Sequence, residues 1–372
     1  MLLVGNPENR RLAMFQNALT MLGLPPATVV SYLDLLQRQT NLCAYVTPGM
    51  VARLESPGEN FEVERELLRL GFADAEAEGC ARVDPATLDT MLYDHGRILY
   101  LRQWYLGLSR FLRSLRDLPC RFMNAPDDIL CMFDKTETHR RCQAAIPVPP
   151  SLKPVQNFDE LIAAMITAGW NRVFIKSAHG SSASGVGALH KLNDGTMRLV
   201  TTTEMVRDTE HLKLYNSLKI RTYTDFHEIA RLIDEWCRHR VHVEKWLPKA
   251  AQDGYPYDLR IVVIGGEPAH AVVRLGFRGT ITNLHLGNRR GDFEQLAEKM
   301  GTERLHEIHE TCRKVSRLFP DSHVIGVDLL LTPRFREHYV LELNAFGDLL
   351  PGLLFRGYDT YGYEIVKWFG SD

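Results

Sequence analysis

The spacing of apolar and polar positions predicts a chain in which helices and strands alternate over most of its length. Near the N-terminus the apolar run 2–4 predicts a short strand, and a helix follows in which apolar side chains recur at helical spacing, namely Leu12, Phe15, Leu19 and Leu22. A second apolar run at 44–46 predicts another strand and completes the pattern of a strand–helix–strand unit. Residues 88–118 combine helical spacing with aromatic side chains, which is typical of a helix packed on a core.

The composition changes near Pro119, and the pattern beyond it is one of amphipathic helices that lead into strands. This plan occupies 157–176 and is repeated at 225–244. Two hairpin patterns follow, at 257–275 and 324–343, with a helix between them.

Composition narrows the class of protein. The chain has 372 residues, with 44 Lys and Arg against 46 Asp and Glu, so it lacks the basic surplus of a nucleic-acid-binding protein and we expect no nucleic-acid partner. No apolar run reaches the length of about 18 residues that a membrane span needs, so we expect no membrane partner. The seven cysteines show no C-x-x-C spacing, and the N-terminal residues lack the pattern of a signal peptide. These features predict a cytoplasmic protein with reduced thiols.

Three oxygen-bearing side chains fall on the second predicted hairpin. Glu342 and Asn344 are two residues apart, so a strand would turn both to one face, and Asp328 lies on the preceding strand. A few hard oxygen ligands that leave room for water and phosphate suit Mg²⁺. A solvated strand edge explains the pattern about equally well.

A lysine and a loop of small residues form a second constellation. Lys176 ends an apolar strand and precedes a Gly/Ser-rich loop, whose candidate phosphate-binding members are Gly180, Ser181, Ser182, Ser184 and Gly185. Small residues let backbone N–H groups approach phosphate oxygens, and the lysine supplies positive charge. Because the lysine precedes the loop, the pattern is not a P-loop, and a flexible connector is the alternative. His179 either donates to a phosphate or is exposed with the loop.

Charged side chains on the first hairpin form a third constellation. Asp258 and Arg260 share one face of an apolar strand, Arg274 lies on the partner strand, and Arg289 follows in a polar loop. Such charges suggest a cleft, and a paired surface ladder is the alternative.

Taken in order, these motifs resemble those of the ATP-grasp superfamily of carboxylate–amine and carboxylate–thiol ligases, over roughly 120–360. Lys135, in the sequence Asp134-Lys135-Thr136, is similar to the lysine that opens the ATP-binding region, and Lys176 is similar to the second nucleotide lysine. The segment 244–247 resembles the hinge that lies along adenine in this superfamily; its residues are Glu244, Lys245, Trp246 and Leu247. The resemblance also places Asp258 and Leu341 in the nucleotide site and makes Asp328, Glu342 and Asn344 the magnesium ligands.

The resemblance implies an α/β (α+β) protein with the ATP-grasp fold and an N-terminal α/β domain. The expected domains are 1–120, a first ATP-grasp subdomain at 121–243 with the glycine-rich loop, and a C-terminal subdomain at 244–372 with the metal site. The implied activity is ATP-dependent joining of a carboxylate to an amine or thiol through an acyl phosphate, with release of ADP and phosphate. Phosphoryl transfer without ligation and a non-enzymatic nucleotide-binding regulator are the alternatives.

The same resemblance implies roles and partners. ATP and Mg²⁺ are the expected cofactors, with Mn²⁺ as an alternative metal, and the substrates are small-molecule or peptide carboxylates and amines. Arg274 is the candidate that stabilises the tetrahedral intermediate, and Arg260 or Arg289 is the candidate that binds the carboxylate. Similar ligases are frequently homodimers, so a homodimer is compatible with this assignment. The sequence departs from the family after Asn344, where proline is delayed to Pro351, and 191–221 carries no motif.

Overall fold

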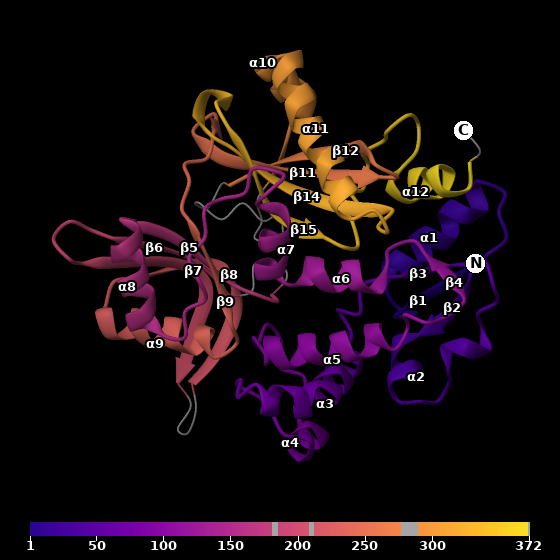
Figure 1. The fold of residues 1–372 in the computed structure, drawn as a ribbon, viewed down its shortest axis with the longest axis horizontal. Coiled ribbons are helices and arrows are strands. Elements are labelled where there is room, and N and C mark those ends of the chain that lie inside the picture. The colour runs from indigo at the N-terminus through magenta and orange to yellow at the C-terminus, as the bar shows by residue number, and fades with distance from the viewer. Residues whose placement is uncertain (181–184, 208–211, 277–288, 371–372) are drawn as a thin grey trace.

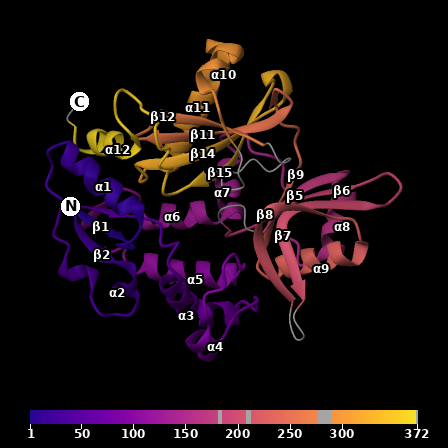
Figure 2. The same ribbon diagram turned by 180° about the vertical axis from the view of Figure 1, so that it is seen from behind.

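The computed structural model describes residues 1–180, 185–207, 212–276 and 289–370, and the strands within these ranges form three sheets (Figure 1). The same three sheets are seen from behind in Figure 2. None of the helices described is both long enough and apolar enough to cross a membrane.

The N-terminal sheet is parallel, with the strand order β2-β1-β3-β4. Its strands are β1 (Leu2–Gly5), β2 (Thr28–Ser31), β3 (Met50–Leu54) and β4 (Cys120–Phe122). One face packs on α1 (Arg10–Met21) and on α12 (Thr360–Phe369), which lie side by side in both views (Figures 1 and 2). The other face packs on α2 (Tyr32–Leu36), α3 (Phe61–Ala77) and α5 (Leu101–Arg113), with α4 (Pro85–Thr90) beyond them.

The strand expected at 44–46 is wrong. Residues Leu42–Ala44 form a 3-10 turn, in which the side chain of Asn41 accepts from the N–H of Cys43, and Tyr45 is exposed. The strands next to β1 are β2 and β3. Three consecutive apolar residues were too short a pattern to distinguish a strand from a turn.

The second sheet is antiparallel, with the order β8-β7-β6-β5-β9. Its strands are β5 (Arg172–Ser177), β6 (Val186–Lys191), β7 (Met197–Arg207), β8 (Leu212–Tyr223) and β9 (Val241–Lys245). Helices α8 (Phe158–Ala168) and α9 (Phe226–Cys237) cover one face with a continuous apolar core, which leaves the other face for the site.

The third sheet is also antiparallel and has the order β13-β12-β11-β14-β15, with β10 paired to β11. Its strands are β10 (Ala251–Gln252), β11 (Tyr255–Ile264), β12 (Glu267–Leu275), β13 (Arg289–Gly291), β14 (Val324–Leu331) and β15 (His338–Asn344). Both expected hairpins are present, and Gly265 and Gly266 adopt the positive φ angles of 54° and 81° that a tight two-residue turn requires. Helix α10 (Phe293–Met300) precedes α11 (Thr302–Leu318), which packs on this sheet, while α6 (Pro126–Phe133) and α7 (Lys135–Cys142) connect the N-terminal sheet to the site (Figure 1).

The stretch 191–221, which carried no motif, forms most of the long hairpin β7–β8. Strand β8 lies at the sheet edge, and a segment of the N-terminal region pairs with it: the N–H of Ile98 donates to the carbonyl of Leu214 (2.8 Å) and the N–H of Asn216 to that of Gly96 (2.7 Å). The hairpin therefore attaches the second sheet to the N-terminal region.

A cluster of buried charges joins α12 to the N-terminal sheet. The Nε of Arg53 donates to Oε1 of Glu55 at 2.7 Å, and the same guanidinium forms an ion pair with Glu364 on α12. The hydroxyl of Tyr361 donates to Glu55 at 2.9 Å. Burial raises the pKa of Glu364 to about 7, since Arg53 only partly offsets burial and the charge of Glu55.

This pKa predicts a stability that depends on pH. The folded pKa of Glu364 lies above its ordinary value of 4.5, so the folded state binds the extra proton, and its contribution is lost as pH rises from about 4.5 through 7. At about 1.4 kcal/mol per pKa unit, Glu364→Gln should remove a pH-dependent contribution of up to about 3 kcal/mol. Urea unfolding at pH 5 and pH 8 measures it, with exposed Glu294→Gln as the control. Identical pH dependence in wild type and Glu364→Gln would contradict the prediction.

Candidate nucleotide and metal site

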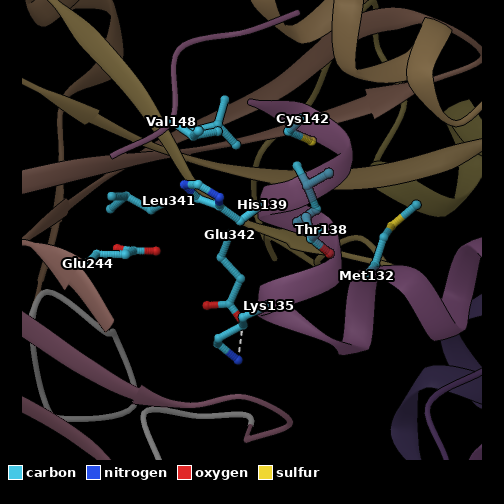
Figure 3. Close-up of a pocket in the computed structure, with 11 residues that line it drawn as sticks. Met132, Lys135, Thr138, His139, Cys142, Val148, Glu244, Leu341 and Glu342 are labelled. Atoms are coloured by element: carbon cyan, nitrogen blue, oxygen red, sulfur yellow. Dashed lines mark ion pairs between the residues drawn. The ribbon is translucent and has the colours of Figure 1, made fainter. Parts of the chain in front are cut away.

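Two lysines, one on α7 and one on β5 of the second sheet, meet β15 of the third sheet. Lys135 is the first residue of α7; its Nζ donates to the carbonyl of Gly180 at 2.6 Å and lies 3.1 Å from Oε1 of Glu342 (Figure 3). Lys176 on β5 places its Nζ 2.7 Å from Oε2 of Glu244 and 3.3 Å from the carbonyl of Leu341. The structure therefore brings together Lys135, Lys176, Glu244, Leu341 and Glu342.

Glu244 is buried on β9 and remains ionised. Burial alone would raise its pKa, but Lys176 and His242 lower the pKa to about 2. The imidazole Nε2 of His242 lies 3.2 Å from Oε1 of Glu244, so both carboxylate oxygens face a nitrogen. This arrangement fixes the ammonium group of Lys176 between the two sheets.

A narrow cavity lies between α7, β9 and β15 (Figure 3). Its apolar lining consists of Met132, Cys142, Val148, Val340, Leu341 and Leu343, and its polar lining of Lys135, Thr138, His139, Glu244 and Glu342. Apolar walls beside a lysine are the surroundings that a nucleotide base and its phosphates need. The cavity volume is about 20 Å³, so the surrounding side chains must move apart before it can hold a base.

The register of β14 and β15 gathers the predicted metal ligands. Asp328 lies opposite Glu342, and Gly326 lies opposite Asn344, so the three polar side chains share one face of the ladder. Gly326 matters here because a Cβ at its position would lie 3.2 Å from the Cβ of Asn344. The amide nitrogen of Asn344 donates to the carbonyl of Gly326 at 3.5 Å. Carboxylate and amide oxygens are the donors that Mg²⁺ prefers, so the chemistry of Glu342 and Asn344 fits an Mg²⁺ ion completed by phosphate oxygens and water.

Asp328 is engaged by two arginines. Nη2 of Arg260 donates to Oδ2 of Asp328 at 3.0 Å, and Nη2 of Arg274 lies 3.1 Å from the same oxygen. Despite burial, these guanidinium groups lower the pKa of Asp328 to about 2. Within the described part of the chain, no three His, Cys, Asp or Glu side chains gather as a metal site by themselves. The role of Asp328 as a metal ligand stays a prediction.

The arginines belong to a wider buried network. Nε of Arg274 donates to Oδ1 of Asp258 at 2.6 Å, and Nζ of Lys249 lies 3.1 Å from the other oxygen of Asp258. Nη1 of Arg260 donates to Asp348 at 3.1 Å. Asp348 belongs to the loop after Asn344, so the segment that departs from the family pattern contacts the candidate site.

The other predicted residues fall in different places. Arg289 is exposed on β13, the third sheet's far edge. Lys245 and Trp246 line a separate shallow groove with Trp170, Arg172 and His190, and Leu247 is half-buried. Thus Glu244 reaches the cavity while the next two side chains line another surface.

The glycine-rich loop is described only at its ends. Ser181, Ser182 and Ser184 lie outside the described residues. Gly180 accepts from Lys135, and Gly185 has a φ of 64°, with its carbonyl accepting from the N–H of Ser177 at 2.8 Å. A Cβ at Gly185 would meet the hydroxyl of Ser177 at 2.0 Å, so this position requires glycine.

Several residues around the site carried no clear sequence signal. His242, Thr138 and His139 line the cavity or hold Glu244, and each sits in an ordinary helix or strand pattern. The alternative that His179 is exposed with the loop is wrong. Its side chain is buried, with 3% exposed, and its ring packs on Tyr105 with the ring centroids 4.1 Å apart. The partners of these residues come from distant segments, so local patterns could not reveal them.

Comparison with known proteins identifies the family. Residues 130–345, more than half of the chain, match the family described as YheC/D-like ATP-grasp. The chain belongs to the YheC/D-like ATP-grasp family. The expected ATP-grasp fold with mixed helices and sheets is thereby confirmed. No curated protein matches this ATP-grasp chain significantly.

Solved structures share the fold of this ATP-grasp protein at low identity. D-cycloserine synthetase DcsG is 13% identical, with a TM-score of 0.55 and coverage of 99% of both chains. Macrocyclase MdnC from Microcystis aeruginosa MRC, bound with precursor peptide MdnA, is 11% identical, with a TM-score of 0.52 and coverage of 99% of this chain and 98% of that one. ATP-grasp ligase PsnB, complexed with a phosphomimetic variant of its minimal precursor, Mg and ADP, is 15% identical, with a TM-score of 0.52 and coverage of 98% and 97%.

Proposed function

We propose that this protein is an ATP-dependent ligase that joins a carboxylate to an amine through an acyl phosphate and releases ADP and phosphate. The observation that supports this most is the meeting of two lysines, one on α7 and one on β5, with Leu341 and Glu342 of β15, in the sheet that also holds two buried arginines. The lysines and arginines can therefore neutralise the negative charge of ATP phosphates and of a substrate carboxylate that bind beside β15.

ATP would lie with its base in the apolar cavity and its phosphates towards the lysines. The ammonium group of Lys135 lies beside Glu342, and that of Lys176 lies beside Glu244 and the carbonyl of Leu341, three residues that line the cavity. Both ammonium groups are held by carboxylates and backbone carbonyls, so they need little reorganisation to meet phosphate oxygens. Glu342 and Asn344 would hold Mg²⁺, which when bound neutralises charge on the phosphates.

The buried arginines would bind the substrate carboxylate and stabilise the negative charge that develops on it. In the first step a carboxylate oxygen attacks the terminal phosphorus of ATP, and the bond to ADP breaks. In the second step the amine lone pair attacks the carbonyl carbon and negative charge grows on the carbonyl oxygen. The carbonyl then re-forms as the bond to phosphate breaks, and the amine nitrogen loses a proton to solvent or to the departing phosphate. Arg274 and Arg260 are 8% and 9% exposed and are fixed by Asp258, Asp328 and Asp348, which is the preorganisation that such a charge requires.

Substrates of two sizes are proposed, small molecules and peptides. Proteins that share the fold include a D-cycloserine synthetase and a macrocyclase bound with a precursor peptide, so both sizes belong in the test. We place the reaction in the cytoplasm, where ATP and reduced thiols are both present.

The test is release of ADP and phosphate from Mg-ATP across pooled carboxylates and amines, with and without hydroxylamine as a trap. The proposal predicts acceptor-dependent phosphate release and a hydroxamate with hydroxylamine. ADP formation with phosphate retained on a product would instead establish a kinase. Nucleotide binding without turnover in every small-molecule and peptide pool would favour a non-enzymatic regulator.

A further inference from the structure

A histidine outside the expected catalytic set links the N-terminal region to a nucleotide lysine. His179 follows β5 and is buried between α5 and α7. Its Nε2 lies 3.1 Å from Oδ2 of Asp134 and 3.0 Å from Nη1 of Arg102. One ring nitrogen thus faces an acceptor on one side and a donor on the other.

Asp134 uses its two carboxylate oxygens for different purposes. Oδ1 accepts from the N–H groups of Thr136 and Glu137, both at 3.0 Å, and so caps the first turn of α7. Oδ2 faces His179. Although burial opposes it, the hydrogen bond from His179 lowers the pKa of Asp134 to about 2, so the carboxylate is charged and accepts. The proton of the imidazole therefore lies on Nε2, where it is donated to Asp134.

The capped turn contains Lys135. The N–H of Lys135 donates to the carbonyl of Ala178 at 3.0 Å, and its Nζ donates to the carbonyl of Gly180 at 2.6 Å. These carbonyls flank His179 in the chain. Hydrogen bonds to the residues on either side of His179 therefore hold both the backbone N–H and the ammonium group of Lys135.

The N-terminal helices hold the other side of the imidazole. Arg102 on α5 is clamped by Glu78, with its Nε donating to Oε2 at 2.8 Å and its Nη2 to Oε1 at 2.6 Å. Its Nη1 lies 3.0 Å from Nε2 of His179, which donates its proton to Asp134 and so cannot accept from Arg102. The side chain of α5 that holds the imidazole is therefore Tyr105, whose ring covers it with ring centroids 4.1 Å apart. Burial lowers the pKa of His179, and the charges of Arg102 and Lys135 lower it further against the opposing effect of Asp134, so the ring is neutral.

We propose that His179 is a positioning residue: through Asp134 it fixes the first turn of α7 and the ammonium group of Lys135 for a nucleotide phosphate, and through its packing on Tyr105 it ties this turn to the N-terminal helices. The inference rests on the nucleotide role of Lys135 in the proposed function. A lysine held only by its own flexible chain would lose more entropy on binding phosphate, so the histidine lowers the cost of nucleotide binding.

Two substitutions separate this role from simple packing. In His179→Gln the amide nitrogen takes the place of Nε2 and can still donate to Asp134. In His179→Asn the amide nitrogen takes the place of Nδ1 and cannot reach it. Both lose the ring that stacks on Tyr105, so the difference between them isolates the bond to Asp134. Exposed His227→Asn on α9 is the control.

The experiment measures affinity for a non-hydrolysable ATP analogue with Mg²⁺ by calorimetry, the KM for ATP, and the melting temperature. A charge-assisted hydrogen bond is worth about 1.5–3 kcal/mol, so we expect His179→Asn to weaken nucleotide affinity and raise the KM for ATP about 10-fold or more. His179→Gln should stay within about 3-fold, and the KM for the acceptor should change in neither variant. In a cycle with Asp134→Asn, the two losses should not add.

The outcomes are distinguishable from failure of the proposed function. If wild type binds nucleotide and both His179 variants bind it equally well, the positioning role is wrong while the ligase proposal stands. If the two variants lose melting temperature and affinity to the same extent, packing alone explains the residue, and the inference fails. If wild type binds no nucleotide, the proposed function fails, and the inference fails with it.

Discussion

Glu342→Gln is expected to reduce ATP turnover on the order of 10³-fold while the protein stays folded. Glutamine keeps the shape of the side chain but removes the negative charge that faces Lys135 at 3.1 Å and lies opposite Asp328 on the neighbouring strand. Because this side chain is partly exposed, the loss of its charge costs little stability. Phosphate release measured over a series of Mg²⁺ concentrations tests the prediction.

The control is Glu337→Gln, an exposed carboxylate just before β15. This variant should turn over ATP at the wild-type rate. Wild-type turnover by Glu342→Gln at ordinary Mg²⁺ concentrations would show that Glu342 does not serve the reaction, and the metal assignment would then be wrong.

Lys176→Met is expected to impair both nucleotide binding and stability. The substitution removes a cation from the phosphate end of the cavity and leaves the buried Glu244 without its strongest partner. Breaking a buried pair by removing one member costs about 3–5 kcal/mol, because the remaining charge stays buried. We expect nucleotide affinity to fall at least about 10-fold, measured by calorimetry, and the free energy of unfolding to fall by that cost, measured with urea.

The sign of the pH dependence offers a separate check. The folded pKa of Glu244 is about 2, below its ordinary value of 4.5, so its pairing stabilises the fold above pH 4.5 and this stabilisation is lost as pH falls through 2. The difference between wild type and Lys176→Met should therefore shrink on acidification. Exposed Lys299→Met should change neither quantity. An equal difference at pH 7 and pH 3 would exclude the loss of the Glu244 pair as the cause.

The sequence was most informative on strands, where the two-residue repeat decides which face of the sheet a side chain occupies. Alternation with leucines predicted that Glu342 and Asn344 would share a face, and the register of β14 with β15 brings Asp328 opposite Glu342 on that face. The hinge was harder, because four consecutive residues cannot all face one cavity. Glu244 faces it, whereas Lys245 and Trp246 line a different groove.

Contacts between distant segments could not be predicted from one sequence. His179 is held by residues 45 and 77 positions away, and the stretch 191–221 forms the hairpin that pairs with the segment at 96–98. No repeat of apolar and polar residues within a short segment marks these contacts, so only the folded structure reveals them. The domain boundaries at 120 and 243, the homodimer and the roles of the individual site residues stay predictions.

The packing of α12 against the N-terminal sheet has a consequence for how the chain is made. Arg53 and Glu364 are 311 positions apart, so the ribosome synthesises the first sheet long before the helix that neutralises and covers it. Until α12 arrives, the apolar surface around Phe15 has no cover from Tyr361, and the guanidinium of Arg53 lacks one of its carboxylates. A chain that stops short of residue 360 should therefore leave the face of its N-terminal sheet around Phe15 exposed to proteases and chaperones. Incomplete copies would then be removed before they could bind nucleotide.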